Sequence, residues 1–182
     1  MIIFMGVAGS GKSIQGRILA DELALPWLST GEFLRMLVSG ERRKDMIAGK
    51  LLSDNEIIAL VQRIFTIIDP SKEFILDGFP RTTAQADWLI GQIKHGQLHA
   101  TAVIHLVVSK EAVHERLLSR GRPDDTIEAI AERLSEYDQA AKPILQHFTA
   151  ARVPIFDIDG SKPVKEVQSQ ILSVLKDKTI QA

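Results

Sequence analysis

The apolar residues of this chain occur in two alternating patterns, short continuous runs and runs of helical spacing. The short runs, wholly or mainly apolar and each typical of a buried strand, cover residues 1–5, 25–28, 73–76, 102–108 and 154–158. Apolar residues three or four positions apart predict helices over 12–23, 41–52, 82–93, 110–120 and 162–176, and further helices that begin near residues 30, 53 and 126. Strands and helices that alternate in this way are typical of an α/β fold.

Three of the expected helices follow one another before residue 65 without a strand between them, which indicates a helical insertion. Ser29 or Thr30 is suited to cap the first of these helices. Residues 53–56, SDNE, match a capping box and predict the start of the last one.

The later helices carry two further expectations. In the helix over 82–93, the side chains expected to face the core are Ala84, Trp88 and Leu89. The long helix that begins near residue 126 contains Pro143. Because a proline inside a helix removes one backbone hydrogen bond, we expect this helix to be kinked or split there.

The first candidate site is the loop after the first strand. Residues 6–13, GVAGSGKS, match the phosphate-binding pattern G-x-x-x-x-G-K-[ST] at every fixed position. The glycines allow consecutive backbone N–H groups to point at one anion, and the following helix favours the same anion at its N-terminus. Lys12 adds a mobile positive charge, and Ser13 is placed to face a magnesium ion. The loop is therefore expected to bind phosphate.

The second candidate site is the end of the third strand, where Asp77 and Gly78 are followed by Arg81. In a protein with a phosphate loop, a carboxylate at the carboxyl end of a buried strand is well placed to hold water around magnesium. Gly78 allows a ligand to approach the backbone closely. Arg81 projects from the same edge, and Gln85 lies one helical turn beyond it. Taken alone, Asp-Gly and Pro-Arg are also common in surface turns.

Arginines form the third candidate group, because Arg116, Arg120, Arg122 and Arg133 fall within eighteen residues. Arg116 and Arg120 lie four residues apart and so share one face of a helix. Scattered arginines on helices are usually solvated or paired at the surface. Next to a phosphate loop, however, the group is better interpreted as ligands of phosphate.

Composition narrows the function classes. With 182 residues, 45% of them hydrophobic, the chain is expected to form one globular domain with a full-sized core. A net charge of −1 gives the protein no overall electrostatic field that would attract nucleic acid or a membrane surface. No apolar run approaches the roughly 18–20 residues of a membrane span. The absence of cysteine excludes disulfides, thiolate zinc sites and thiol catalysis. We therefore expect a soluble, cytoplasmic protein that binds neither nucleic acid nor membranes.

Seven motifs together carry a family resemblance. They are GVAGSGKS at 6–13, STGEFLR at 29–35, GKLLSDNEIIALV at 49–61, LDGFPRTTAQA at 76–86, RLLSRGRPDD at 116–125, ERLSEY at 132–137 and DGSKPVKEV at 159–167. With these motifs in order, the chain resembles the adenylate kinase family over nearly its whole length. The resemblance implies reversible phosphoryl transfer from MgATP to AMP, giving two ADP, by a monomer that uses Mg²⁺ and no zinc.

The resemblance also implies a single kinase domain over 1–182, with the three-layer fold of P-loop NTPases and a five-stranded parallel sheet. The expected parts are a core (1–29, 60–118 and 126–182), a monophosphate-binding insertion (30–59) and a lid (119–125). This lid is very short and lacks the hairpin and the zinc site of some bacterial members. The phosphate loop departs from the family's usual Gly-Lys-Gly-Thr, because Lys12 is followed by Ser13 and Ile14, which leaves magnesium coordination open.

The roles of individual residues follow from the same resemblance. The residues expected to bind ATP are Gly9, Ser10, Gly11, Lys12, Ser13, Ile14, Arg116, Arg120 and Lys162. The residues expected to bind AMP are Thr30, Arg35, Lys50, Leu51, Leu52, Gly78, Phe79, Pro80, Arg81, Gln85, Arg122 and Arg133. The residues expected to act on the transferred phosphoryl group are Lys12, Arg81, Arg120, Arg122 and Arg133. Ser13 and Asp77 are expected to hold Mg²⁺, Asp77 through water.

AMP is the expected acceptor, because the Gln85 amide offers a donor and an acceptor together, as the edge of adenine requires. Thr30 also resembles the AMP-selective members of the family. Two alternatives remain open. One is a kinase for another small acceptor, such as CMP, UMP or a sugar acid; Gln85 and the GFPR stretch argue against it. The other is a nucleotide-binding regulatory protein with weak turnover, and the complete set of arginines argues against that.

Overall fold

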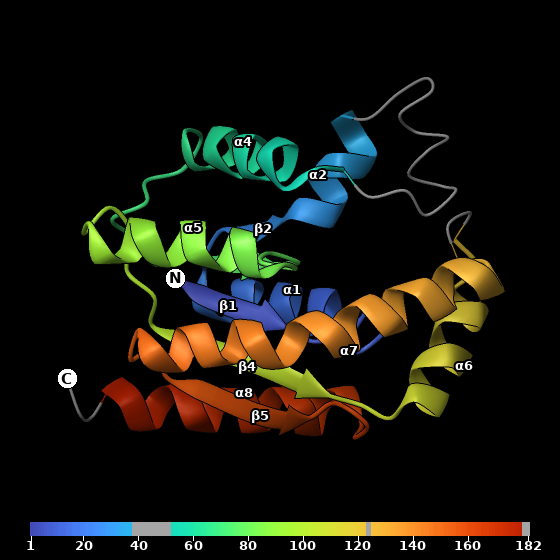
Figure 1. The fold of residues 1–182 in the computed structure, drawn as a ribbon. Helices are drawn as coiled ribbons and strands as arrows, with labels where there is room; N and C mark the ends of the chain where they lie inside the picture. The colour runs from blue at the N-terminus through green and yellow to red at the C-terminus, as the bar shows by residue number, and fades with distance from the viewer. Residues whose placement is uncertain (38–51, 123–124, 180–182) are drawn as a thin grey trace.

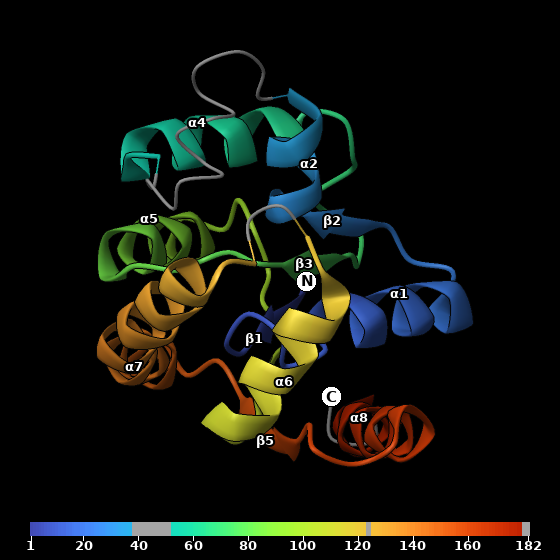
Figure 2. The same cartoon turned by 90° about the vertical axis from the view of Figure 1, so that its right-hand side faces the viewer.

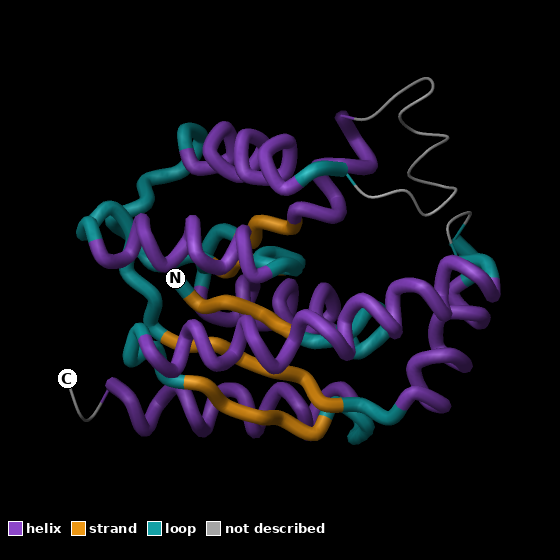
Figure 3. Tube along the Cα trace, in the orientation of Figure 1, coloured by secondary structure: helices purple, strands orange, loops and turns teal. Residues whose placement is uncertain are grey.

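The protein contains one parallel β-sheet, which organises the rest of the chain. The computed structural model describes residues 1–37, 52–122 and 125–179. The strands are β1 (Ile2–Met5), β2 (Trp27–Ser29), β3 (Ile75–Asp77), β4 (Ala102–Val107) and β5 (Ile155–Asp159). They lie in the order β2-β3-β1-β4-β5, and every neighbouring pair is parallel. Figure 3 shows the strands in orange among the purple helices. The expected α/β fold with a five-stranded parallel sheet is confirmed.

Helices cover both faces of this sheet. They are α1 (Lys12–Leu23), α2 (Thr30–Leu37), α4 (Asp54–Phe65), α5 (Thr83–Lys94), α6 (Lys110–Arg120), α7 (Ile127–Ala150) and α8 (Val164–Thr179). Figure 2 shows α5 and α7 on one face and α1 and α8 on the other, which makes three layers. Helices α2 and α4 lie beyond the β2 edge of the sheet (Figures 1 and 2). None of the helices in the described ranges is long and apolar enough to cross a membrane.

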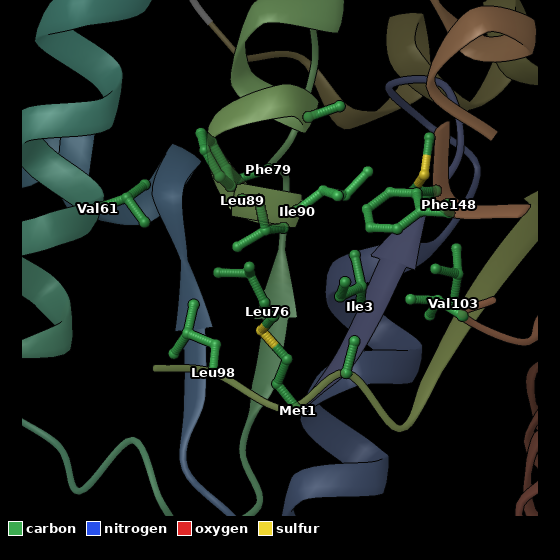
Figure 4. Packing of buried hydrophobic residues seen from close by; sticks show 14 of the residues in the cluster. Met1, Ile3, Val61, Leu76, Phe79, Leu89, Ile90, Leu98, Val103 and Phe148 are labelled. Atoms are coloured by element: carbon green, nitrogen blue, oxygen red, sulfur yellow. The ribbon is translucent and has the colours of Figure 1, made fainter. Parts of the chain in front are cut away.

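The central strands β1 and β3 are buried along their whole length, which leaves little freedom in their register. Ile3, Leu76 and Val103 are paired across β1, β3 and β4, and each is 0% exposed. Figure 4 shows their side chains in the cluster that also contains Leu89 of α5 and Phe148 of α7. Burying a side chain of this kind contributes roughly 1.5–3 kcal/mol to the stability of the fold. A shift of one residue in the pairing would move the side chains of a strand to the opposite face of the sheet. The register therefore holds the loops that follow β1 and β3 side by side.

Local signals set most helix ends. Helices α1 and α6 have the predicted bounds. Ser53 caps α4, and its capping box with Glu56 is confirmed. Thr82 and Thr126 accept backbone N–H groups at the starts of α5 and α7. The helix expected over 41–52 lies outside the described residues, except for Leu52, which is not helical.

Three details differ from the sequence-based predictions. Thr30 is already helical and its hydroxyl donates to the carbonyl oxygen of Gly78 at 2.8 Å, so it does not cap α2. Ala84 is exposed, because α5 turns the face with Gln85 and Leu89 inward instead. Helix α7 continues through Pro143 and is not split. Buried residues on both sides of the proline hold the helix on the core, so packing outweighs the missing hydrogen bond.

Candidate active site

The phosphate-loop sequence connects the carboxyl end of β1 to α1, as predicted. Gly9 has a φ of +85°, and a Cβ there would lie 2.9 Å from the side chain of Leu117, so only glycine fits. Ser10 is buried, whereas Ile14 is 55% exposed at the start of α1. Gly11 precedes the first turn of α1, which brings the positive end of the helix to the loop. The backbone is thus shaped to hold an anion.

Lys12 folds back over this loop. Its Nζ donates to the carbonyl oxygens of Gly6 at 2.6 Å and Val7 at 2.7 Å. Burial lowers the pKa of Lys12 to about 8; the negative charge of Asp77 opposes this shift, and Arg81 and Arg120 add to it. Burial disfavours the charged form of Lys12, and a nearby negative charge favours it. An anion bound in the loop would therefore stabilise the charged form and raise this pKa.

Asp77 and Ser13 form the candidate metal site. The Ser13 hydroxyl donates to Asp77 Oδ2 at 2.7 Å, and Asp77 is 2% exposed at the end of β3. A hydroxyl and a carboxylate are the hard oxygen ligands that Mg²⁺ prefers, and Mg²⁺ commonly takes its remaining ligands from water and phosphate. The residue types and their placement beside the phosphate loop therefore fit Mg²⁺, even though the hydroxyl lies one position nearer Lys12 than in the family pattern.

A second anion site lies at the start of α2. A Cβ on Gly31 would lie 3.4 Å from Arg35 Nη2 and 3.6 Å from Arg81 Nη2, so the two guanidinium groups approach the same point. Arg81 Nε donates to the carbonyl oxygen of Gly78 at 2.8 Å. Gly78 itself has a φ of +82°, and a Cβ there would lie 2.9 Å from Thr30 Oγ1. The glycines thus make room for the arginines.

The charge around Arg81 favours an anionic ligand. Partial desolvation, together with the positive charges of Arg35 and Arg133, lowers the pKa of Arg81, while Asp77 and Glu136 oppose the shift. Two neighbouring guanidinium groups repel each other, and an anion between them would relieve the repulsion. A phosphate group has the charge and the number of acceptor oxygens for this position.

Gln85 is held next to this second site. Its Oε1 accepts the backbone N–H of Arg81 at 2.8 Å, and its Nε2 donates to Asp54 Oδ1 at 2.7 Å. Asp54 Oδ1 also accepts the hydroxyl of Thr82 at 2.8 Å. Gln85 is 3% exposed. Sequence reasoning singled out Gln85 but missed Asp54, which comes from α4.

Asp125 brings together the arginines of the expected lid and of α7. Its Oδ2 and Oδ1 accept Arg120 Nε at 2.8 Å and Arg120 Nη2 at 2.6 Å, a bidentate pair. Oδ1 also lies 3.4 Å from Arg133 Nη1, and Oδ2 accepts the backbone N–H of Arg122 at 3.3 Å. Although burial alone would raise the pKa of Asp125, the hydrogen bond and charge of Arg120, the Arg122 N–H and the charge of Arg133 lower it.

Glu32 joins its own helix α2 to α1 and to the loop after α6. Its Oε1 lies 2.6 Å from Arg35 Nη2 and 3.7 Å from both Arg17 Nη2 and Arg122 Nη2. Burial would raise the pKa of Glu32, but the hydrogen bond from Arg35 and the charges of Arg35, Arg122 and Arg17 lower it. Glu32 therefore keeps Arg122 near the second anion site. Sequence reasoning assigned no role to Glu32 or Arg17.

The remaining predicted residues are placed as follows. Arg116 Nη1 and Nη2 donate to the carbonyl oxygens of Gly160 at 3.0 Å and Ser161 at 3.5 Å, which brings Arg116 to the loop that contains Lys162. Phe79 is 0% exposed and packs edge-on against Trp88, and Pro80 is also buried, so both are core residues. Leu52 is half-buried. Lys50 and Leu51 lie outside the described residues.

Comparison with known proteins gives a consistent result. A family model described as adenylate kinase matches residues 4–153. The adenylate kinase of Corynebacterium urealyticum is 34% identical over 180 residues, which cover 96% of this chain and 98% of that protein. The adenylate kinase of Stenotrophomonas maltophilia strain K279a is 34% identical over 185 residues, with the same coverage. That of Chelativorans sp. is 36% identical over 190 residues, covering 96% of this chain and 97% of that protein.

Proposed function

Because this chain belongs to the adenylate kinase family, we propose that the site described above transfers a phosphoryl group reversibly from MgATP to AMP. The chain is an enzyme, a nucleoside monophosphate kinase. One observation carries the assignment of the site: a phosphate loop with Lys12 and a separate pair of guanidinium groups, Arg35 and Arg81, lie at neighbouring strand ends. Phosphoryl transfer between two nucleotides requires two phosphate-binding centres close to each other.

ATP binds at the phosphate loop in this proposal. The residues assigned to its phosphates are Gly9, Ser10, Gly11, Lys12, Ser13 and Ile14. Arg116 and the loop at Lys162 are in contact through the carbonyl oxygens of residues 160 and 161, and they are assigned to the adenine. Ser13 directly and Asp77 through water would hold Mg²⁺. When bound, Mg²⁺ neutralises charge on the phosphates during transfer.

In the same proposal, AMP binds at the second anion site, at the start of α2, and not at the phosphate loop. Arg35 and Arg81 are assigned to its phosphate, because their guanidinium groups already converge near Gly31. The assignment to the acceptor site also includes Thr30, Gly78, Gln85 and the backbone of residues 50–52. We also propose the division into parts that the sequence led us to expect. The insertion (30–59) binds the acceptor, and the lid (119–125) covers the phosphates.

Arg120, Arg122 and Arg133 supply positive charge to the transferred phosphoryl group. Phosphoryl transfer needs little covalent help from the protein and depends on positioned charge. Asp125 orients Arg120 and Arg133 before any substrate arrives, so little reorganisation is required during the reaction. We also propose that the enzyme acts as a cytoplasmic monomer, as the family resemblance implies.

A coupled assay of ADP formation tests the proposal. MgATP is supplied with AMP, GMP, CMP, UMP or no acceptor, and initial rates are compared. We expect strong turnover with AMP and little with the other acceptors. A preference for CMP or UMP would keep the kinase activity and overturn the assignment of the acceptor base. ATP binding without acceptor-dependent turnover would support a regulatory protein instead.

ATP binding is expected to take up protons in alkaline solution. The pKa of Lys12 is lowered to about 8, so at about pH 9 the free protein carries Lys12 mainly in its neutral form. The phosphates of ATP favour the charged form and would raise this pKa. Hence a proton should be taken up on binding, and ATP affinity should fall as the pH rises above about 8.

Isothermal titration calorimetry in two buffers of different ionisation enthalpy measures this uptake. At about pH 7, where Lys12 already carries its proton, uptake should be small, which provides an internal control. The variant Lys12→Arg keeps its charge throughout this pH range and should show no extra uptake at about pH 9. Equal proton uptake by the wild type at both pH values would contradict the expectation.

A further inference from the structure

The amide of Gln85 has one orientation that suits its surroundings. The backbone N–H of Arg81 needs an acceptor, and it lies 2.8 Å from Oε1. The carboxylate of Asp54 needs a donor, and its Oδ1 lies 2.7 Å from Nε2. If the amide were rotated by half a turn, its NH₂ group would face an N–H and its carbonyl would face a carboxylate. Both hydrogen bonds would be lost, and two repulsive contacts would replace them.

Thr82 reinforces this orientation. Its hydroxyl accepts the backbone N–H of Gln85 at 3.2 Å, and so its own proton is available for Asp54 Oδ1 at 2.8 Å. The same carboxylate oxygen therefore accepts from both Thr82 and Gln85. Asp54 is on α4 and its two partners are at the start of α5, so the contact also joins the two helices.

The orientation of the amide matters for base recognition. The fixed contacts leave one N–H on Nε2 and one lone pair on Oε1 without a partner in the described part of the chain. The Watson–Crick edge of adenine offers a complementary pair, the N6 amino group as donor and N1 as acceptor. Hypoxanthine and guanine offer the opposite pair, O6 as acceptor and N1–H as donor. A glutamine that can rotate would serve either kind of base; one that is held cannot.

We propose that Asp54 is the positioning residue that makes the acceptor site select adenine over 6-oxopurines, by preventing rotation of the Gln85 amide. This inference rests on the proposed function, in which Gln85 contacts the acceptor base. Asp54 acts through Gln85 and touches no substrate. Removing its carboxylate leaves only the Arg81 N–H to set the orientation, so the penalty for the rotated amide falls by one charged hydrogen bond and one repulsive contact.

The test is the ratio of kcat/KM for AMP to kcat/KM for IMP. IMP carries the O6 and N1–H pair without the additional amino group of GMP. Comparing IMP with AMP therefore tests only the exchange of donor and acceptor on the Watson–Crick edge of the base. In the Asp54→Ala variant we expect this ratio to fall by about tenfold or more, the usual effect of a hydrogen bond to a charged group. Asp54→Asn, which can present either an oxygen or an NH₂ group, should give an intermediate ratio and serves if the alanine variant does not fold.

Glu56→Gln provides the matched control. It removes a carboxylate from the same helical turn as Asp54, and glutamine can still complete the capping box with Ser53. Its AMP to IMP ratio should equal that of the wild type. A purely structural role of Asp54 would lower kcat/KM for both acceptors in parallel, so an unchanged ratio in Asp54→Ala would overturn the inference and leave the proposed function intact. A wild-type enzyme without a preference for AMP over IMP would instead overturn the assignment of Gln85, and the inference with it.

Discussion

Replacing Arg81 with alanine is expected to lower kcat with AMP by about a hundredfold to a thousandfold. Arg81 lies on the edge where the two nucleotides are proposed to meet, with Arg35 beside it and Lys12 close enough for the two charges to interact. The free energy of unfolding should change little, because the Arg81 side chain is exposed and its one described hydrogen bond is to the Gly78 carbonyl oxygen.

Steady-state kinetics with each substrate varied, together with urea unfolding, checks both parts of this expectation. Arg63→Ala is a suitable control, since Arg63 is an exposed arginine near the end of α4 and is assigned no role in the site. Arg81→Lys keeps the charge but not the planar guanidinium group, and its kcat should lie between those of the wild type and Arg81→Ala. Wild-type turnover in Arg81→Ala would remove Arg81 from the mechanism.

Replacing Asp125 with alanine is expected to reduce both turnover and stability. The side chain of Asp125 is 0% exposed, and its loss leaves Arg120 and Arg133 without the carboxylate that orients them. We expect kcat to fall by about a hundredfold or more. The free energy of unfolding should fall by about 1–3 kcal/mol, less than for a fully buried ion pair, because Arg120 remains 31% exposed to solvent.

The stability effect of Asp125 should depend on pH. Because its arginine partners lower the pKa of Asp125 in the folded protein, its contribution is present above the unfolded-state pKa near about 4 and is lost as the pH falls through the folded-state pKa. Unfolding of the wild type and of Asp125→Asn should therefore differ most near neutral pH and converge in acid. Asp138→Asn, which removes an exposed carboxylate paired with Lys110, is the control. An equal stability difference at neutral and strongly acidic pH would contradict this account.

Sequence reasoning predicted the parts of the protein that depend on near neighbours in the chain. The phosphate loop and the capping box of α4 act through backbone groups a few residues away, so a short window contains the whole signal. The five-stranded parallel sheet followed from the family resemblance, whereas the order of its strands was not predicted. The exposed position of Ala84 was missed because alanine is too small to mark the buried face of a helix on its own.

Asp77 was predicted from the sequence, but the roles of Glu32, Asp54 and Asp125 were not, because the partners of these carboxylates are recognised only in the folded chain. Asp54 and Gln85 are 31 positions apart, and Glu32 meets Arg122 only when α2 and the loop after α6 are folded together. Asp125 was visible within the RGRPDD stretch, but neighbouring charges of opposite sign in a loop are equally typical of a solvated turn. Its burial, which gives it the orienting role, is a property of the tertiary structure.

The contacts at the two ends of the insertion suggest where a chimera could be cut. At the entry, the Thr30 hydroxyl donates to the Gly78 carbonyl oxygen; at the exit, Asp54 accepts from Thr82 and Gln85. A graft that exchanges only residues 31–53 with a relative keeps both contacts within the original protein. A graft that extends to residue 59 separates Asp54 from the partners with which it is matched. The insertion is thus exchangeable as a unit only inside these two contacts.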